Sequence, residues 1–287
     1  HIGGTLLAGC DAGDVQQLER QTALLTSQGV SAELLSGREV RALEPTLGPR
    51  VGGGVHLPEE RSVDPRAVLT ALQQRVGEDV VVDGRSPIDP CDATVIATGA
   101  VLPEPFTHLV RRVRGEILRV RTDDPPGCTV RGLVHGEPVY VVPRPRPEGA
   151  NSCDVVVGAT AEEHDAAAVV TLGGVARILD AARVLMPGLD RAELVETLAR
   201  DRPGTPDNLP LVGPSGVPGT TLAAGHYRHG VLLAPLTARL VADHLETGHV
   251  EPALDPRRLT DRWSSRSRSD RVETPHPPQG ADPWTSP

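Results

Sequence analysis

The chain has 287 residues, of which 38% are apolar and 23% charged, as in an ordinary folded soluble protein of one or two domains. The net charge of −9 and the scarcity of aromatic residues, with two Trp, two Tyr and one Phe, disfavour binding to a nucleic-acid backbone or stacking on single-stranded bases. All 29 basic residues are Arg, which excludes a lysine Schiff base with pyridoxal phosphate and a phosphate-loop lysine.

Helix and strand patterns alternate in the first hundred residues, as in a doubly wound sheet. Ser36 and Glu39 form a capping-box pattern that opens a short helix, and Asp64 followed by proline opens another. The predicted elements are, in chain order, a strand at 4–8, a helix at 11–28, the helix from 36, a strand at 51–57, the helix from 64, and strands at 79–82 and 92–98. The last two strands are rich in β-branched residues, and we expect them to be covered on both faces.

The middle of the chain changes character, because strand patterns follow one another without intervening helices, which predicts an antiparallel sheet. The predicted elements are strands at 113–121, 138–142 and 154–160, a helix at 171–185, strands at 195–200 and 220–224, and a helix at 231–245. In this last helix we expect an apolar stripe to face the core, made of Leu232, Leu233, Leu236, Leu240 and Val241.

Spacing and hydropathy limit the kinds of site and the location. The four cysteines lie far apart, which disfavours a disulfide framework or a zinc ribbon, and His226 and His229 lack a third metal ligand at a sensible spacing. The sequence contains no signal-peptide pattern and no run of about 18 apolar residues that could span a membrane. We therefore predict a cytoplasmic protein with no metal site, no membrane segment and no nucleic-acid partner.

Three segments carry residues that point to a bound ligand. The strand ending at Thr98-Gly99 brings a glycine to its carboxyl end, where open α/β sheets bind cofactors, although strands also end in glycine for steric reasons alone. The segments 200–213 and 225–237 contain Arg202 and Arg228, each of which offers a planar fork for a carboxylate or stands as a solvated surface charge. In the second of these segments, a Gly-bounded loop opens a helix whose first amides can face an anionic or electron-rich ring edge.

The stretches Arg202–Asn208 and Gly225–Pro235, in that order, resemble the C-terminal signature of the glycine oxidases that serve thiazole synthesis for thiamine. These enzymes belong to the FAD-dependent D-amino-acid oxidase superfamily. Weaker matches extend the resemblance over about residues 3–250, at 4–7, 39–45, 63–65, 97–100, 113–119, 139–144 and 156–160.

The resemblance implies a mixed α/β and α+β fold, in which an incomplete Rossmann-type FAD-binding domain is interleaved with an antiparallel-sheet substrate domain. The substrate domain would comprise residues 1–57 and 106–200, and the FAD-binding domain residues 58–105 and 201–250. The Arg-, Ser- and Pro-rich composition predicts a disordered tail over 251–287. Because the sequence begins with His1 and not Met, at a strand pattern that extends back to Ile2, we expect an N-terminal segment to precede it.

The resemblance also implies roles for individual residues. Arg202 would bind the substrate carboxylate at two points, Tyr140 would add a hydroxyl hydrogen bond, and Arg228 would line the same pocket near the flavin. Thr98 and Gly99 would approach the FAD diphosphate. The pyrimidine edge of the flavin would be wrapped by Gly225, His226, Tyr227, Arg228, His229, Gly230, Val231 and Leu232.

The implied reaction is the FAD-dependent oxidative deamination of glycine or a small relative to glyoxylate and ammonia, with oxygen reduced to hydrogen peroxide. Such a reaction needs the protein chiefly for orientation and electrostatics. Two alternatives stay open. One is an oxidase or dehydrogenase of D-amino acids or sarcosine on the same scaffold, and the other is a non-catalytic remnant without the main FAD site. The resemblance favours a homo-oligomer.

The sequence departs from the family pattern at several points. The G-x-G-x-x-G fingerprint is absent, and Gly52–Leu57 lacks its third glycine and precedes a proline, so we reject it as a phosphate loop. The stretch 83–90 is shorter than the expected strand hairpin. His229 replaces a usual Asn, and Arg200 and Asp201 replace small or apolar residues, so we expect extra charge beside Arg202.

Overall fold

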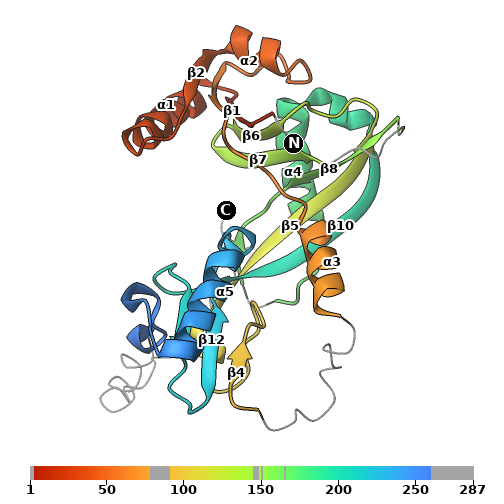
Figure 1. Cartoon of the computed structure of the whole chain (residues 1–287). Coiled ribbons are helices and arrows are strands. Elements are labelled where there is room, and N and C mark those ends of the chain that lie inside the picture. Colours follow the sequence, from red (N-terminus) through yellow and green to blue (C-terminus); the bar gives the residue numbers. More distant parts are fainter. Residues whose placement is uncertain (1–2, 78–90, 145–148, 150, 165, 260–287) are drawn as a thin grey trace, which may run out of the picture.

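The computed structural model describes residues 3–77, 91–144, 149, 151–164 and 166–259. The predicted strand at 79–82 and the stretch 83–90 therefore lie outside the described residues. Two sheets organise the described part of the chain (Figure 1). The large sheet has the strand order β10-β5-β8-β7-β6-β1-β3-β2, with β9 also paired to β5, and the small sheet has the order β11-β12-β4.

The strands of the large sheet are β1 (Thr5–Gly9), β2 (Glu33–Ser36), β3 (Gly53–Leu57), β5 (Arg111–Thr122), β6 (Thr129–Val134), β7 (Glu137–Pro143), β8 (Cys153–Gly158), β9 (Glu162–Glu163) and β10 (Glu193–Gly204). Those of the small sheet are β4 (Thr94–Ile96), β11 (Leu211–Pro214) and β12 (Thr220–Ala224). The helices are α1 (Ala12–Ser27), α2 (Gly37–Leu43), α3 (Pro65–Val76), α4 (Leu172–Leu185) and α5 (Gly230–Thr247), with short 3-10 turns at Thr107–Leu109, Pro187–Arg191 and Pro252–Leu254.

Side-chain caps begin the first three helices, and the sequence predicts those of α2 and α3. Asp11 and Asp14 form a capping box at the start of α1, Ser36 and Glu39 form another at α2, and the Asp64 carboxylate accepts a backbone N–H at the start of α3. Gly53–Leu57 of the stretch rejected as a phosphate loop form β3, which lies between β1 and β2 and pairs with both.

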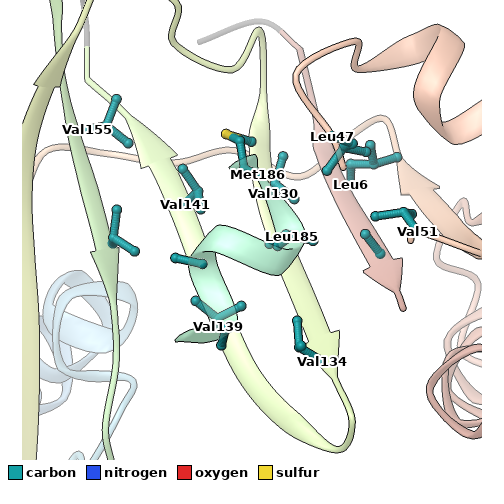
Figure 2. Packing of buried hydrophobic residues seen from close by; sticks show 14 of the residues in the cluster. Leu6, Leu47, Val51, Val130, Val134, Val139, Val141, Val155, Leu185 and Met186 are labelled. Carbon is teal, nitrogen blue, oxygen red and sulfur yellow. The ribbon is translucent and has the colours of Figure 1, made fainter. Parts of the chain in front are cut away.

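The main core lies between α4 and one face of the large sheet (Figure 2). Alternate residues of the strands, among them Val139, Val141 and Val155, point toward this helix, which buries Leu185 completely. The absence of a side chain at Gly132 admits Leu185, since a Cβ there would lie 2.6 Å from its Cδ2 atom. The opposite face of β7 and β8 carries Tyr140, which pairs with Gly158, and this face leads to the candidate site.

The small sheet is covered less completely than the sequence predicts. Leu102, Phe106, Leu211 and Leu222 form a compact core. However, β4 pairs only with β12 among the described strands, and Val95 in its centre is 40% exposed, so the expectation that this strand is covered on both faces is wrong.

The apolar stripe expected in the last helix is only partly buried. α5 lies against β11 and β12, and Leu233, Leu240 and Val241 are half-buried. Leu232 and Leu236, however, are exposed, so the prediction is wrong for these two residues. The pattern correctly predicts a helix, but within the described residues no second layer covers that side of it.

The segment 251–259 packs on the small sheet instead of starting a tail. Leu259 contacts the core cluster that contains Leu211 and Leu222, and Arg258 forms an ion pair with Asp207 at 2.7 Å. The predicted disorder is therefore wrong for these nine residues, because an apolar contact and an ion pair hold them. The rest of the predicted tail lies outside the described residues.

Candidate functional site

Arg202 lies on β10, because this strand continues beyond the predicted end at 200 and pairs with β5 as far as Gly204. Its Nη1 atom donates to the carbonyl oxygens of Arg114 at 3.3 Å and Thr160 at 3.1 Å. Among the described residues no carboxylate forms an ion pair with it. Burial lowers the pKa of Arg202, and the nearby charge of Arg228 acts in the same direction. The guanidinium is thus a half-buried cation whose remaining N–H groups can bind an anion.

Tyr140 lies on β7, on the face of the large sheet that also carries Arg202. Its hydroxyl sits over Gly158 of β8, where a Cβ would be 2.8 Å from the phenol oxygen. Burial raises the pKa of Tyr140, and the charges of Arg202, Arg144 and Arg228 oppose that rise. The phenol therefore lies within electrostatic range of three guanidinium groups.

Arg228 comes from the loop between β12 and α5. The backbone N–H of Tyr227 donates to the Pro203 carbonyl at 2.8 Å, which attaches this loop to β10 directly after Arg202. The Arg228 guanidinium stacks over the Tyr227 ring at 5.4 Å from its centroid. The structure thus brings Arg202, Arg228 and Tyr140 together, as the sequence predicts, although their roles stay predictions.

The same loop depends on glycine at its start. Gly225 has φ +74°, and a Cβ at this position would overlap the Thr205 side chain. The His229 N–H donates to the His226 carbonyl at 2.9 Å, and α5 begins at Gly230 with Val231 and Leu232 exposed. The first amides of this helix are therefore accessible to a ligand.

The predicted cofactor residues of β4 and β12 meet at one edge, since the two strands are parallel and Ile96 pairs with Leu222. Thr98 and Gly99 follow β4 there, and Gly225 follows β12. The Thr98 hydroxyl donates to the Val101 carbonyl at 2.6 Å, whereas a Cβ at Gly99 would meet nothing within 4 Å. The backbone at Gly99 is open on the side where a ligand could approach.

His226, one of the two histidines of this loop, has a hydrogen-bond partner within the described residues. His226 Nε2 lies 2.8 Å from the Thr237 hydroxyl, and burial lowers the pKa of its imidazole. The described part of the chain contains no group of three His, Cys, Asp or Glu residues that could hold a metal ion.

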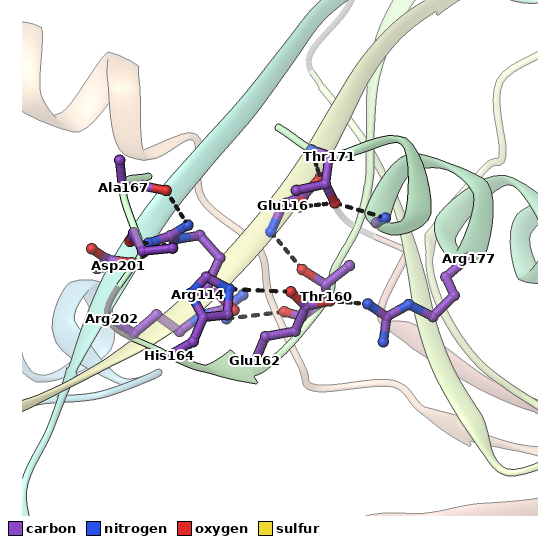
Figure 3. Close-up of polar contacts among 12 residues, drawn as sticks. Arg114, Glu116, Thr160, Glu162, His164, Ala167, Thr171, Arg177, Asp201 and Arg202 are labelled. Atoms are coloured by element: carbon purple, nitrogen blue, oxygen red, sulfur yellow. Dashed lines mark hydrogen bonds and ion pairs between the residues drawn. The ribbon is translucent and has the colours of Figure 1, made fainter. Parts of the chain in front are cut away.

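Asp201 does not add charge beside Arg202, contrary to expectation (Figure 3). Successive side chains of a strand point to opposite faces, so Asp201 points away from the site and accepts from Arg114 Nε at 2.6 Å. Arg114 is only 1% exposed and donates also to the carbonyls of Ala166 and Ala167. Arg200 lies two residues before Arg202, so its side chain is on the same face of β10, and it is exposed.

Sequence reasoning missed the residues beneath the site. Gly115 and Gly158 lie under Arg202 and Tyr140, and the buried Glu116 accepts from the Thr171 hydroxyl at 2.8 Å (Figure 3). The Thr160 hydroxyl accepts the Glu116 N–H, which fixes the segment whose carbonyl receives Arg202. Both glycines fall in weakly matching stretches of the family resemblance, at 113–119 and 156–160, but nothing in the sequence indicates that they lie beneath these side chains.

The chain matches the family model described as FAD dependent oxidoreductase (DAO) over residues 1–244. It is 35% identical over 260 residues to the putative thiamine biosynthesis oxidoreductase ThiO of Rhizobium etli, which covers 88% of this chain and 74% of that protein. It is 32% identical over 236 residues to the bifunctional protein ThiO/ThiG of Trichormus variabilis, which covers 75% of this chain.

A solved glycine oxidase from Geobacillus kaustophilus superimposes with a TM-score of 0.74 at 28% identity, covering 89% of this chain and 73% of that one. The match confirms the predicted mixed α/β class. The chain spans 35% of the bifunctional relative and 74% of the Rhizobium protein. Within the described residues, none of the helices combines the length and the apolar character needed to cross a bilayer.

Proposed function

Because the chain belongs to the family of FAD dependent oxidoreductases, we propose that it binds a small amino acid at Arg202, Arg228 and Tyr140 and supports its oxidative deamination. The observation that carries this proposal is the convergence of these three side chains from β10, β7 and the loop before α5. Two guanidinium groups without acidic partners among the described residues attract a carboxylate, and the phenol can donate a third hydrogen bond.

Arg202 is the residue best suited to bind the substrate carboxylate. Its Nη1 atom is held by the Arg114 and Thr160 carbonyls, so the guanidinium is oriented before the substrate arrives. Partial burial strengthens a charged hydrogen bond relative to one in open water. Orientation of this kind is the contribution that a redox reaction at the substrate Cα requires from the protein.

The described residues fit the flavin end of FAD. The loop from Gly225 to Leu232 has the close backbone and open helix amides that the pyrimidine edge requires, and the open backbone at Thr98 and Gly99 suits a diphosphate. FAD supplies, when bound, the electron sink that accepts the Cα hydrogen with its electron pair. In this proposal residues 1–57 and 106–200 form the substrate domain, and residues 58–105 and 201–250 contribute to cofactor binding.

Glycine is the proposed substrate. With oxygen and water it would give glyoxylate, ammonia and hydrogen peroxide, which balances the reaction. The names of the relatives, a thiamine biosynthesis oxidoreductase and a glycine oxidase, support this choice and a role in supplying thiazole synthesis. A cytoplasmic location and a homo-oligomer remain predictions.

The test supplies FAD to the purified chain and measures hydrogen peroxide release with glycine, sarcosine, D-alanine and D-proline. We expect the wild-type chain to turn glycine over. The Arg202→Ala variant should keep its bound flavin but lose most of the turnover. Arg200→Ala, on the same strand, is the matched control and should retain its activity. Faster turnover of sarcosine or a D-amino acid would favour the alternative oxidases, and a colourless protein that ignores FAD would contradict the proposal.

A further inference from the structure

We infer that Gly115 and Gly158 are positioning residues of the candidate site, because their missing side chains leave the space in which the Arg202 guanidinium and the Tyr140 phenol lie. This inference rests on the proposed function for its kinetic consequences. Glycine weakens a strand relative to alanine, so two glycines on one face of a central sheet need a reason.

Gly115 lies in β5 opposite Arg200, and the side chain of Arg202 folds back across the sheet to cover it. The nearest neighbours of a Cβ at this position would be Nη2, Cζ and Nη1 of Arg202, all closer than real Cβ atoms come to other groups. The guanidinium therefore lies flat on the backbone. Its two carbonyl acceptors belong to Arg114, which precedes the glycine, and to Thr160.

Gly158 provides the same kind of space for Tyr140. It pairs with Ile117 on one side and with Tyr140 on the other, so the three residues form one row across β5, β8 and β7. A Cβ at this position would lie 2.7 Å from Ile117 Cγ2 and 2.8 Å from the Tyr140 hydroxyl oxygen. A methyl group would therefore displace the phenol from its present height above the sheet.

The two glycines differ in how easily their neighbours can move. At Gly115 the obstructing atoms are the end of a flexible side chain, which can swing away at little cost to the fold. At Gly158 they belong to a stiff ring and a β-branched side chain, so the strand itself would have to shift. Gly115→Ala is consequently the sharper test, because the protein should stay folded while Arg202 is misplaced.

A third strand glycine gives the matched control. Gly132 lies in β6 and pairs with Val139, so it faces α4, where a Cβ would meet Leu185. Gly132→Ala therefore disturbs the core on the face opposite to the site. We expect it to lower the thermal stability and to leave the substrate affinity unchanged.

The experiment compares wild type, Gly115→Ala and Gly132→Ala by thermal unfolding, by calorimetric binding of acetate, and by KM and kcat for glycine. In Gly115→Ala we expect KM and the acetate dissociation constant to rise about tenfold or more with little change in the melting temperature. In the Arg202→Ala background the same glycine substitution should cause no further loss, since it acts through Arg202. Wild-type values in folded Gly115→Ala would overturn the inference.

A crystal structure of Gly115→Ala separates this inference from the proposed function. If the guanidinium of Arg202 has moved from the Arg114 and Thr160 carbonyls, Gly115 positions it. This conclusion would hold even if the wild-type protein proved not to oxidise glycine. A guanidinium that stays in place above the added methyl group would refute the positioning role whatever the substrate. Gly158→Ala, with the position of Tyr140 as its readout, repeats the test at the second glycine.

Discussion

The helices on the two sheets have similarly apolar sequences but differ in what covers them. α4 lies on the large sheet and buries Ile178, Ala182 and Leu185 against its valine-rich face (Figure 2). α5 lies on the small sheet and buries no residue, with Leu232 75% exposed. Helical spacing of apolar residues is thus found both in α4, which is part of a closed core, and in α5, which leaves apolar side chains accessible.

Apolar periodicity therefore predicts the helix but not the layer that covers it. The large sheet covers one face of α4 from Gly174 to Leu185, whereas the small sheet has three described strands and an edge at β4. The long strands β5 and β10 extend from the large sheet toward the small one, and the candidate site lies where they meet the loop before α5 (Figure 1). The site therefore draws Arg202 and Tyr140 from the closed region and Arg228 from the open one.

Two leucine substitutions, one on α4 and one on α5, should differ strongly in their effect on stability. Leu185→Ala removes a fully buried side chain from α4, so we expect the free energy of unfolding to fall by about 2–5 kcal/mol. Leu232→Ala makes the same chemical change on α5 and should alter it by less than about 0.5 kcal/mol. Urea unfolding of both variants measures these values. A comparable loss in Leu232→Ala would mean that the face of α5 is covered in solution.

A second pair of substitutions tests whether the loop between β12 and α5 is tightly packed where it meets β10. Gly225 and Gly99 have nearly equal φ angles, +74° and +73°, but only Gly225 lacks room for a Cβ, which would overlap Thr205. We expect Gly225→Ala to cost about 2–3 kcal/mol, from backbone strain and overlap together, and Gly99→Ala about 1 kcal/mol, from strain alone. Chemical unfolding compares the two, and equal costs would exclude the overlap as a cause.

Much of the fold could be predicted because short-range chemistry determines it. Capping residues such as Ser36 and Asp64 act within one helical turn, and the strands of the antiparallel sheet alternate or are richly β-branched. The signature around Arg202 and Arg228 predicted two groups that the structure brings together. These features depend on neighbours in the sequence or on a recognisable motif.

The remainder could not be predicted because it depends on distant partners. β10 extends to Gly204 only because β5 pairs with it, and this extension decides that Asp201 faces Arg114 instead of the site. The space above Gly115 exists only in relation to Arg202, which lies on another strand. Composition predicted a disordered tail from 251. In the structure Leu259 packs against the core of the small sheet and Arg258 donates to Asp207, and both partners lie far away in the sequence.

The ion pair that attaches the segment 251–259 to the small sheet should contribute least to the free energy of unfolding. Two guanidinium nitrogens of Arg258 donate to the Asp207 carboxylate at 2.7 and 3.1 Å. They hold the pKa of Asp207 at about 2, below its ordinary value of 3.8. The pair is partly exposed to solvent, so we expect Asp207→Asn to lower the free energy of unfolding by about 1 kcal/mol or less at pH 7.

The pH dependence of this difference identifies its cause. A carboxyl group with a lower pKa in the folded state adds stability above the unfolded pKa and loses it as the pH falls toward the folded pKa. The contribution of Asp207 should therefore be complete above about pH 5 and shrink between about pH 4 and pH 2. Urea unfolding of wild type and Asp207→Asn at about pH 7, 4 and 2.5 measures this. A difference that stays constant with pH would show that the Asn variant loses packing of the 205–209 turn, and not the charge pair with Arg258.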